Sequence, residues 1–170
     1  MRNTPLLIRI LALWTLLLAP VAALALAQPK GDPILEITGQ IGVTNRAGAV
    51  VFDRTMLEAI GMEKIVTTTP WHKGAVTFEG PSIAKLLRSV EANGSSVRVV
   101  ALNDYSVTIP MDDFARHGVI LAMKRDGKYM SIRDKGPLFV IYPYDSDAEL
   151  KQQMYYARSA WQVKRIEVLP

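Results

Sequence analysis

The chain contains no cysteine among its 170 residues. It therefore forms no disulfide, offers no thiolate nucleophile, and has neither a cysteine-ligated metal or cluster nor an attachment site for c-type haem. Histidine is scarce as well: His72 and His117 lie far apart, and neither has a partner at ligand spacing. A histidine-based metal site would need carboxylates from distant parts of the chain, and no sequence pattern indicates such carboxylates. The sequence therefore predicts no metal site.

Familiar catalytic patterns are also missing, because the chain has no phosphate loop, dinucleotide fingerprint, HExxH or G-x-S-x-G segment. Asp112-Asp113 and the acids at 145, 147 and 149 resemble acid/base or cation-binding groups. Acids at the start of a helix more often interact with the helix dipole. We therefore assign no catalytic residue.

The first 27 residues have the features of a signal peptide. Arg2 and Arg9 form a positive start, residues 10–26 are almost continuously apolar, and Ala25-Leu26-Ala27 is a small-x-small cleavage pattern. The alternative is an uncleaved membrane anchor, because an apolar run of about 18 residues is the lower limit for spanning a bilayer. The pattern favours cleavage, and hence a periplasmic or secreted protein.

Cleavage leaves a linker over 28–33 and a single domain over 34–170, a length that can bury a sizeable core. The removed segment holds two arginines and no acid, so the formal charge falls from +4 to +2. No cluster of basic and aromatic residues occurs in the remainder. This near balance argues against nucleic acid as a partner.

Hydrophobic periodicity predicts a domain with more strand than helix. Ile83, Leu86, Leu87 and Val90 mark an amphipathic helix, and Asp126-Gly127 is a strong hairpin signal. The expected strands cover 34–39, 50–52, 65–69, 96–102, 105–109, 119–124, 128–132, 137–142 and 161–169. The expected helices follow Asp53 and cover 82–91, 111–118 and 147–157. The segment 137–142 is apolar on both alternating faces, so we expect it to be buried on both.

Five residues are candidates for ligand binding, because they lie in segments predicted as loops or turns. Trp71 and His72 fall in the Thr-rich stretch TTTPWHKG, Asp104 and Tyr105 stand at a strand turn, and Lys135 opens a Lys-Gly-Pro loop that could hold an anion. The alternative is structural: the aromatics form part of the core or its rim, and the basic loop is a tight turn.

Several segments, taken together, resemble one known family. FEGPSIAKLL from Phe78, NDYSVTIPMDD from Asn103, LAMKRDGKYM from Leu121, KGPLFVIYP from Lys135 and WQVKRIEVL from Trp161 occur in the order seen in that family. They are similar to the oxidoreductase molybdopterin-binding domain of the sulfite oxidase type. The resemblance covers about residue 34 to the end, and it implies an α+β, mixed and β-rich domain with a few short helices.

The resemblance also implies molybdopterin as cofactor, with molybdenum held by a cysteine thiolate that this chain lacks. Phe139 stands where the family usually has arginine, and Asn103-Asp104 replaces its Asp-Gly pair. We therefore expect a non-catalytic accessory or sensory module that binds a small anionic ligand or a periplasmic or membrane-anchored protein. One alternative is a molybdenum-cofactor oxidoreductase without a protein thiolate. Another is a purely structural partner domain with a filled cleft.

Overall fold

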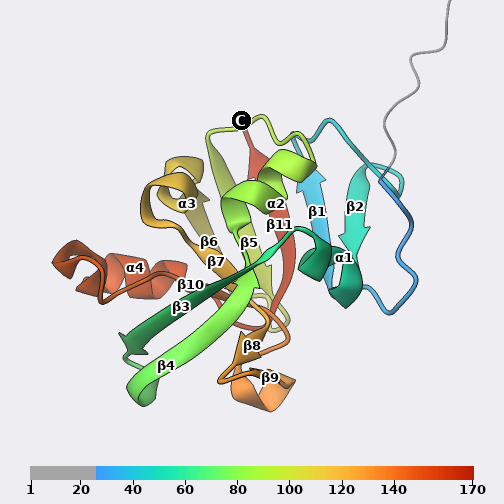
Figure 1. Ribbon diagram of the computed structural model, residues 1–170. Coiled ribbons are helices and arrows are strands. Elements are labelled where there is room, and N and C mark those ends of the chain that lie inside the picture. Colours follow the sequence, from blue (N-terminus) through green and yellow to red (C-terminus); the bar gives the residue numbers. More distant parts are fainter. Residues whose placement is uncertain (1–25) are drawn as a thin grey trace, which may run out of the picture.

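The computed structural model describes residues 26–170, so nearly all of the predicted signal peptide lies outside the described residues. Within these residues the chain forms four helices, two short 3-10 turns and eleven strands. Figure 1 labels the helices and strands along the chain. The helices and 3-10 turns are α1 (Arg54–Ala59), α2 (Ile83–Ser89), α3 (Met111–His117), η1 (Ile132–Asp134), η2 (Ala148–Lys151) and α4 (Gln153–Arg158). The strands are β1 (Leu35–Gly39), β2 (Ala49–Phe52), β3 (Met62–Thr69), β4 (His72–Pro81), β5 (Ser96–Ala101), β6 (Ser106–Pro110), β7 (Ile120–Ala122), β8 (Lys124–Arg125), β9 (Lys128–Tyr129), β10 (Phe139–Ile141) and β11 (Val163–Leu169).

The central layer is a five-stranded sheet in the order β2-β1-β11-β5-β6. β1 and β11, the first and last strands, run parallel, whereas the other neighbouring pairs are antiparallel. Short helices lie around this sheet, with α2 in front of it in the view of Figure 1. The mixed sheet and short helices confirm the predicted α+β class. Within residues 26–170, no helix has the length and apolar character needed to cross a membrane.

A second set of strands packs beside the central sheet. It consists of a four-stranded sheet in the order β3-β4-β8-β9 and the antiparallel pair of β7 and β10. The β3–β4 ribbon extends well beyond the central sheet in Figure 1. β4 crosses β7 so closely at Gly80 that a Cβ there would lie 2.0 Å from the carbonyl oxygen of Leu121. Only glycine leaves room for this contact.

Two clusters of buried side chains form the core. The larger includes Leu121, Val140 and many residues of the five-stranded sheet and α2. The smaller contains Val76, Phe78, Ile120, Ala122, Met130, Phe139 and Ile141. Successive residues of β10 alternate between the two clusters, so this strand is buried on both faces, as predicted for the segment 137–142. Trp71 packs against both clusters and so lies at their boundary.

Local signals located most elements correctly. The side chain of Ser82 caps α2, accepting from the Lys85 amide at 3.4 Å, and Asp53 caps α1 by accepting from Met56 at 2.9 Å. Asp126 and Gly127 have φ angles of 49° and 77°, as the predicted turn requires.

Three expectations about secondary structure are wrong. The Thr-rich stretch is not one loop: the predicted strand over 65–69 is confirmed as the end of β3, β4 begins at His72, and only Pro70 and Trp71 form the turn. The strand expected over 128–132 ends at Tyr129 in β9, and η1 begins at Ile132. The helix expected over 147–157 is divided into η2 and α4, because Gln152 between them is extended, with φ −97° and ψ 152°.

The segment before β1 is attached to the domain. The carboxylate of Asp53 accepts hydrogen bonds from the backbone amides of Lys30 and Gly31, both at 2.8 Å. These bonds hold the predicted linker against the start of α1.

Candidate functional site

Trp71, in the β3–β4 turn, is the centre of an aromatic cluster. Its ring centroid lies 5.3 Å from that of Phe139, 5.8 Å from Trp161 and 6.0 Å from Tyr156. The interplanar angles of 58°, 70° and 80° are the tilted and edge-to-face arrangements that aromatic pairs prefer. These contacts fix the ring where the hairpin meets the remainder of the domain.

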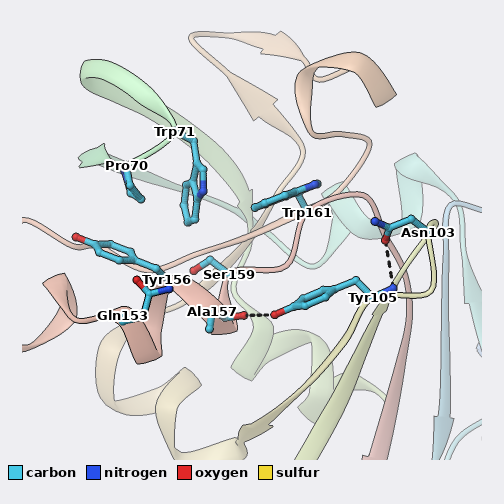
Figure 2. A pocket seen from close by; sticks show the side chains of 9 residues that line it. All are labelled: Pro70, Trp71, Asn103, Tyr105, Gln153, Tyr156, Ala157, Ser159 and Trp161. Atoms are coloured by element: carbon cyan, nitrogen blue, oxygen red, sulfur yellow. Dashed lines mark hydrogen bonds between the residues drawn. The ribbon is translucent and has the colours of Figure 1, made fainter.

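A cavity of about 420 Å³ opens beside this cluster, and we call it the aromatic pocket. Figure 2 shows the indole rings of Trp71 and Trp161 on one side of it and Tyr105 and Tyr156 on the other. The β3–β4 turn, the β5–β6 turn, α4 and the chain just before β11 all contribute to it. The complete lining is Pro70, Trp71, Asn103, Tyr105, Gln153, Tyr156, Ala157, Ser159 and Trp161.

Hydrogen bonds fix the wall formed by Tyr105. Its hydroxyl donates to the carbonyl oxygen of Ala157 at 2.9 Å, and its amide donates to Oδ1 of Asn103 at 3.2 Å. The residue between them, Asp104, has a φ of 64°, a left-handed conformation that reverses the chain. The ring thereby spans from the β5–β6 turn to the end of α4, as Figure 2 shows.

The floor of the pocket is neutral. Ser159 donates its hydroxyl to the carbonyl oxygen of Tyr155 at 2.9 Å and is hydrogen-bonded to the hydroxyl of Tyr144. Burial raises the pKa of the Tyr144 phenol far above its usual value, which keeps the phenol protonated. The floor therefore offers an uncharged surface to anything bound above it.

Charged side chains surround the pocket without lining it, and most of them are paired. Arg158 lies 2.7 Å from Asp113 and Lys164 lies 2.8 Å from Asp104. Lys135 contacts an aromatic ring, whereas Arg158 and Lys164 contact carboxylates. The Nζ of Lys135 lies 4.1 Å from the ring centroid of Trp161. This ammonium is therefore held against an aromatic ring that lines the pocket.

His72 lies next to the pocket lining and does not form part of it. Its Nε2 is 3.1 Å from a guanidinium nitrogen of Arg125, and its Nδ1 is 2.9 Å from Oγ1 of Thr69. Because arginine only donates, Nε2 accepts, so the imidazole is neutral and carries its proton on Nδ1. Burial, followed by the charges of Arg125 and Lys135, holds the pKa of His72 below its ordinary value. Thr69 Oγ1 also accepts from the Trp71 amide at 3.3 Å, so His72 helps to position Trp71.

The structure brings together some of the five sequence-predicted residues. Trp71 and Tyr105 line one pocket, and Lys135 contacts its wall through Trp161. Asp104 is bonded to Lys164, which lowers the pKa of its carboxyl, and His72 lies behind Trp71. A role of these residues in ligand binding stays a prediction.

Sequence reasoning misses five polar or aromatic residues of the lining, which are Asn103, Gln153, Tyr156, Ser159 and Trp161. In the sequence, Trp161 stands out only as part of a family-like strand, and Tyr156 falls in a predicted polar helix. The period of α4 could have separated Tyr156 from its neighbour Tyr155, which is buried in the core. Asn103 stands in the pair that replaces the family's Asp-Gly, next to the predicted Asp104 and Tyr105, whereas Gln153 carries no signal beyond its polarity.

The described part of the chain holds no obvious metal site. Within residues 26–170, no three His, Cys, Asp or Glu side chains come together so that they could hold a metal ion. The aromatic pocket also has no lysine or arginine in its lining to pair with a phosphate.

Comparison with known proteins gives one clear finding. The model of a family described as the oxidoreductase molybdopterin binding domain matches residues 49–169, which is most of the chain. No curated protein matches the sequence.

The aromatic pocket does not fit the molybdenum group that this family description implies. A thiolate ligand is impossible in a chain without cysteine. The lining of the aromatic pocket supplies amides, hydroxyls and aromatic rings, with no carboxylate or imidazole. Such neutral groups are poor ligands for a transition metal, and they suit an organic molecule better.

Proposed function

Because the chain belongs to the oxidoreductase molybdopterin-binding domain family, we propose that it is an exported, non-catalytic member that binds a small ligand in the aromatic pocket. It acts as an accessory or sensory module, and a periplasmic or membrane-anchored protein receives its signal. The observation that carries this proposal is the lining of the pocket. Four aromatic rings and a few neutral polar groups form a cavity of about 420 Å³, without a metal donor set.

The size and chemistry of the cavity support ligand binding over a purely structural role. Pockets for small molecules usually measure about 300–1,000 Å³ and combine aromatic walls with a few polar groups. Asn103, Gln153 and the hydroxyl of Tyr156 provide such polar groups among the lining residues. This cavity supports ligand binding over the alternative of a structural domain with a filled cleft.

The experiment that tests the proposal is elemental and mass analysis of the protein purified from its native export compartment. We expect no stoichiometric molybdenum or tungsten and no pterin, and native mass spectrometry should detect an organic ligand of low mass. Stoichiometric metal together with pterin would contradict the proposal. It would favour the alternative, an oxidoreductase whose molybdenum is held without a protein thiolate.

Export is tested on the same sample. We expect the protein in the periplasmic or secreted fraction, with an N-terminus at Gln28. A chain that stays in the membrane fraction with residues 1–27 attached would identify this segment as an anchor instead. Ligand binding and export are independent, so each part of the proposal can fail alone.

A further inference from the structure

We infer that the ligand of the aromatic pocket is a planar aromatic compound that carries no positive charge. This inference rests on the proposed function, since it names the class of ligand for the same pocket. It depends on two features of the pocket, the arrangement of its rings and the position of Lys135.

The arrangement of the rings favours a flat ligand. Trp71 and Trp161 meet at an interplanar angle of 70°, with their centroids 5.8 Å apart, so they form two adjacent walls. Tyr105 and Tyr156 lie across the cavity from them in Figure 2. A planar ring inserted here can stack on one wall and meet the others edge-on, and such aromatic pairs add about 0.5–1.5 kcal/mol beyond area burial. An aliphatic ligand of the same size loses this contribution.

Aromatic pockets also bind organic cations, so the ring arrangement alone does not determine the charge of the ligand. The charged groups around the pocket determine it. No carboxylate lines the pocket. The nearby acids Asp113 and Asp104 already pair with Arg158 and Lys164, at 2.7 and 2.8 Å. A cationic ligand would thus find aromatic faces without an anion to balance its charge.

Lys135 makes the pocket unfavourable for cations. Its Nζ lies 4.1 Å from the ring centroid of Trp161, so part of the cation-binding capacity of this ring is already used. A ligand stacked on the same indole has the ammonium within roughly 8 Å, where repulsion between two unit charges weakens binding about tenfold. A neutral ring avoids this repulsion, and an aromatic anion is attracted.

The test is isothermal titration calorimetry on the full chain with four probes, each built on two fused six-membered rings. These probes are 2-naphthoate, 2-naphthamide, N-methylquinolinium and decahydro-2-naphthoate, the saturated analogue of 2-naphthoate. We expect 2-naphthoate to bind at least as tightly as 2-naphthamide and N-methylquinolinium about tenfold more weakly than 2-naphthamide. We expect decahydro-2-naphthoate to bind about tenfold more weakly than 2-naphthoate, because it cannot stack.

Two pairs of variants locate the effect. Lys135→Gln should abolish the differences between naphthoate, naphthamide and the quinolinium ion, whereas Lys128→Gln, at an exposed lysine outside the lining, should preserve them. Tyr105→Leu should weaken naphthoate binding about tenfold. Tyr129→Leu should not, although both tyrosines are similarly exposed, at 46% and 42%.

The possible outcomes separate the two proposals. Equal or tighter binding of the quinolinium ion overturns the inference about charge and leaves the pocket as a ligand site. Equal binding of decahydro-2-naphthoate and naphthoate overturns the inference about the aromatic ring. If no probe binds, the inference about the class of ligand is wrong, and native mass spectrometry of the native protein still decides the proposed function. If the probes bind and Tyr105→Leu has no effect, they bind outside the aromatic pocket and the inference is wrong.

Discussion

At the scale of single residues, the carboxylate of Asp113 is a buried charge that two other side chains satisfy. It accepts from the hydroxyl of Tyr142 at 2.8 Å and from Arg158 at 2.7 Å. Its side chain is 7% exposed, and that of Arg158 is 17% exposed. Burial and the nearby charge of Asp113 raise the pKa of Tyr142 far above its usual value, so the phenol remains a donor.

Replacing Asp113 by alanine should strongly destabilise the fold. The substitution leaves a buried phenol without an acceptor and a largely buried guanidinium without a partner, so we expect a loss of about 3 kcal/mol. Urea unfolding followed by circular dichroism measures this loss. The exposed pair of Arg98 and Glu167, 2.9 Å apart, is the control, and Glu167→Ala should change stability by less than about 1 kcal/mol. Similar losses in the two variants would contradict the role assigned to Asp113.

His72 should titrate below its ordinary pKa of 6.5, because burial and the charges of Arg125 and Lys135 disfavour its protonated form. A folded-state pKa below the unfolded value means that the unfolded chain binds more protons, so stability falls as the pH drops below about 6.5. NMR titration of the imidazole protons measures the pKa. We expect Arg125→Gln to raise it only partly towards 6.5, because burial is the larger cause.

The matched control for this titration is Lys128→Gln, which removes an exposed lysine close to Arg125 in sequence and should leave the His72 titration unchanged. In unfolding experiments, His72→Gln should reduce the loss of stability between pH 7 and pH 5. An imidazole that titrates at or above 6.5 in the native protein would rule out the neutral form inferred from its contacts.

At the scale of elements, the close contact between β4 and β7 depends on Gly80. A Cβ at this position would lie 2.0 Å from the carbonyl oxygen of Leu121 and 2.7 Å from Cα of Ala122, and both are backbone atoms. Gly80→Ala should therefore destabilise the domain by about 3 kcal/mol, at the upper end for overpacking. The midpoint of urea unfolding measures the change.

Gly31→Ala is the control for this substitution. At Gly31 an added Cβ would make an ordinary contact of 3.6 Å with Asp53, so we expect a change within about 0.5 kcal/mol. A Gly80→Ala variant as stable as Gly31→Ala would mean that β4 and β7 can separate without loss.

The elements also indicate where sequence patterns are sufficient. Caps at Asp53 and Ser82 and the Asp126-Gly127 turn are local, because all the required contacts lie within a few residues. The β3–β4 hairpin depends in addition on contacts with residues that are distant in the sequence. Thr67 and Thr69 look polar in the sequence but are buried in the ribbon, and Thr67 accepts from the amide of Asp145. Only the folded chain supplies that partner.

The candidate site follows the same division. The sequence predicts Trp71 and Tyr105 as candidates because they lie in segments expected to be loops or turns, where binding residues are concentrated. Trp161 and Tyr156 could not be assigned to the pocket from the sequence, since their places depend on how α4 and the start of β11 pack against the hairpin. The sequence predicts that Lys135 could hold an anion, and its contact with Trp161 depends on the fold and cannot be inferred from the sequence.

At the scale of the whole molecule, the fold should not need the first 27 residues. Removing them deletes the bond from Asn45 Nδ2 to the Ala27 carbonyl, 2.9 Å long, and the contact of Leu26 with the core. Asn45 keeps its bonds to the backbone of Val51, at 2.9 and 2.8 Å. A chain that begins at Gln28 should therefore lose about 1 kcal/mol or less, a change in Tm of about 4 °C.

Differential scanning calorimetry of the two chain lengths tests this prediction. Asn45→Ala in the shorter chain is the reference for a real loss of anchoring, and it should cost about 2 kcal/mol, because Val51 then loses both side-chain partners. Equal melting temperatures of the shorter chain and its Asn45→Ala variant would mean that removal of residues 1–27 already abolishes the anchoring by Asn45. The segment before Gln28 would then be part of the stable fold.

The parallel pairing of β1 with β11 determines when the protein can fold. β11 lies between β1 and β5, so until the seven residues of this last strand arrive, two inner edges of the central sheet have no hydrogen-bonding partner. Contacts between such distant segments form slowly. During synthesis the central sheet consequently cannot be completed before residues 163–169 leave the ribosome, and a chain that stops before Val163 leaves two strand edges exposed, which favours aggregation.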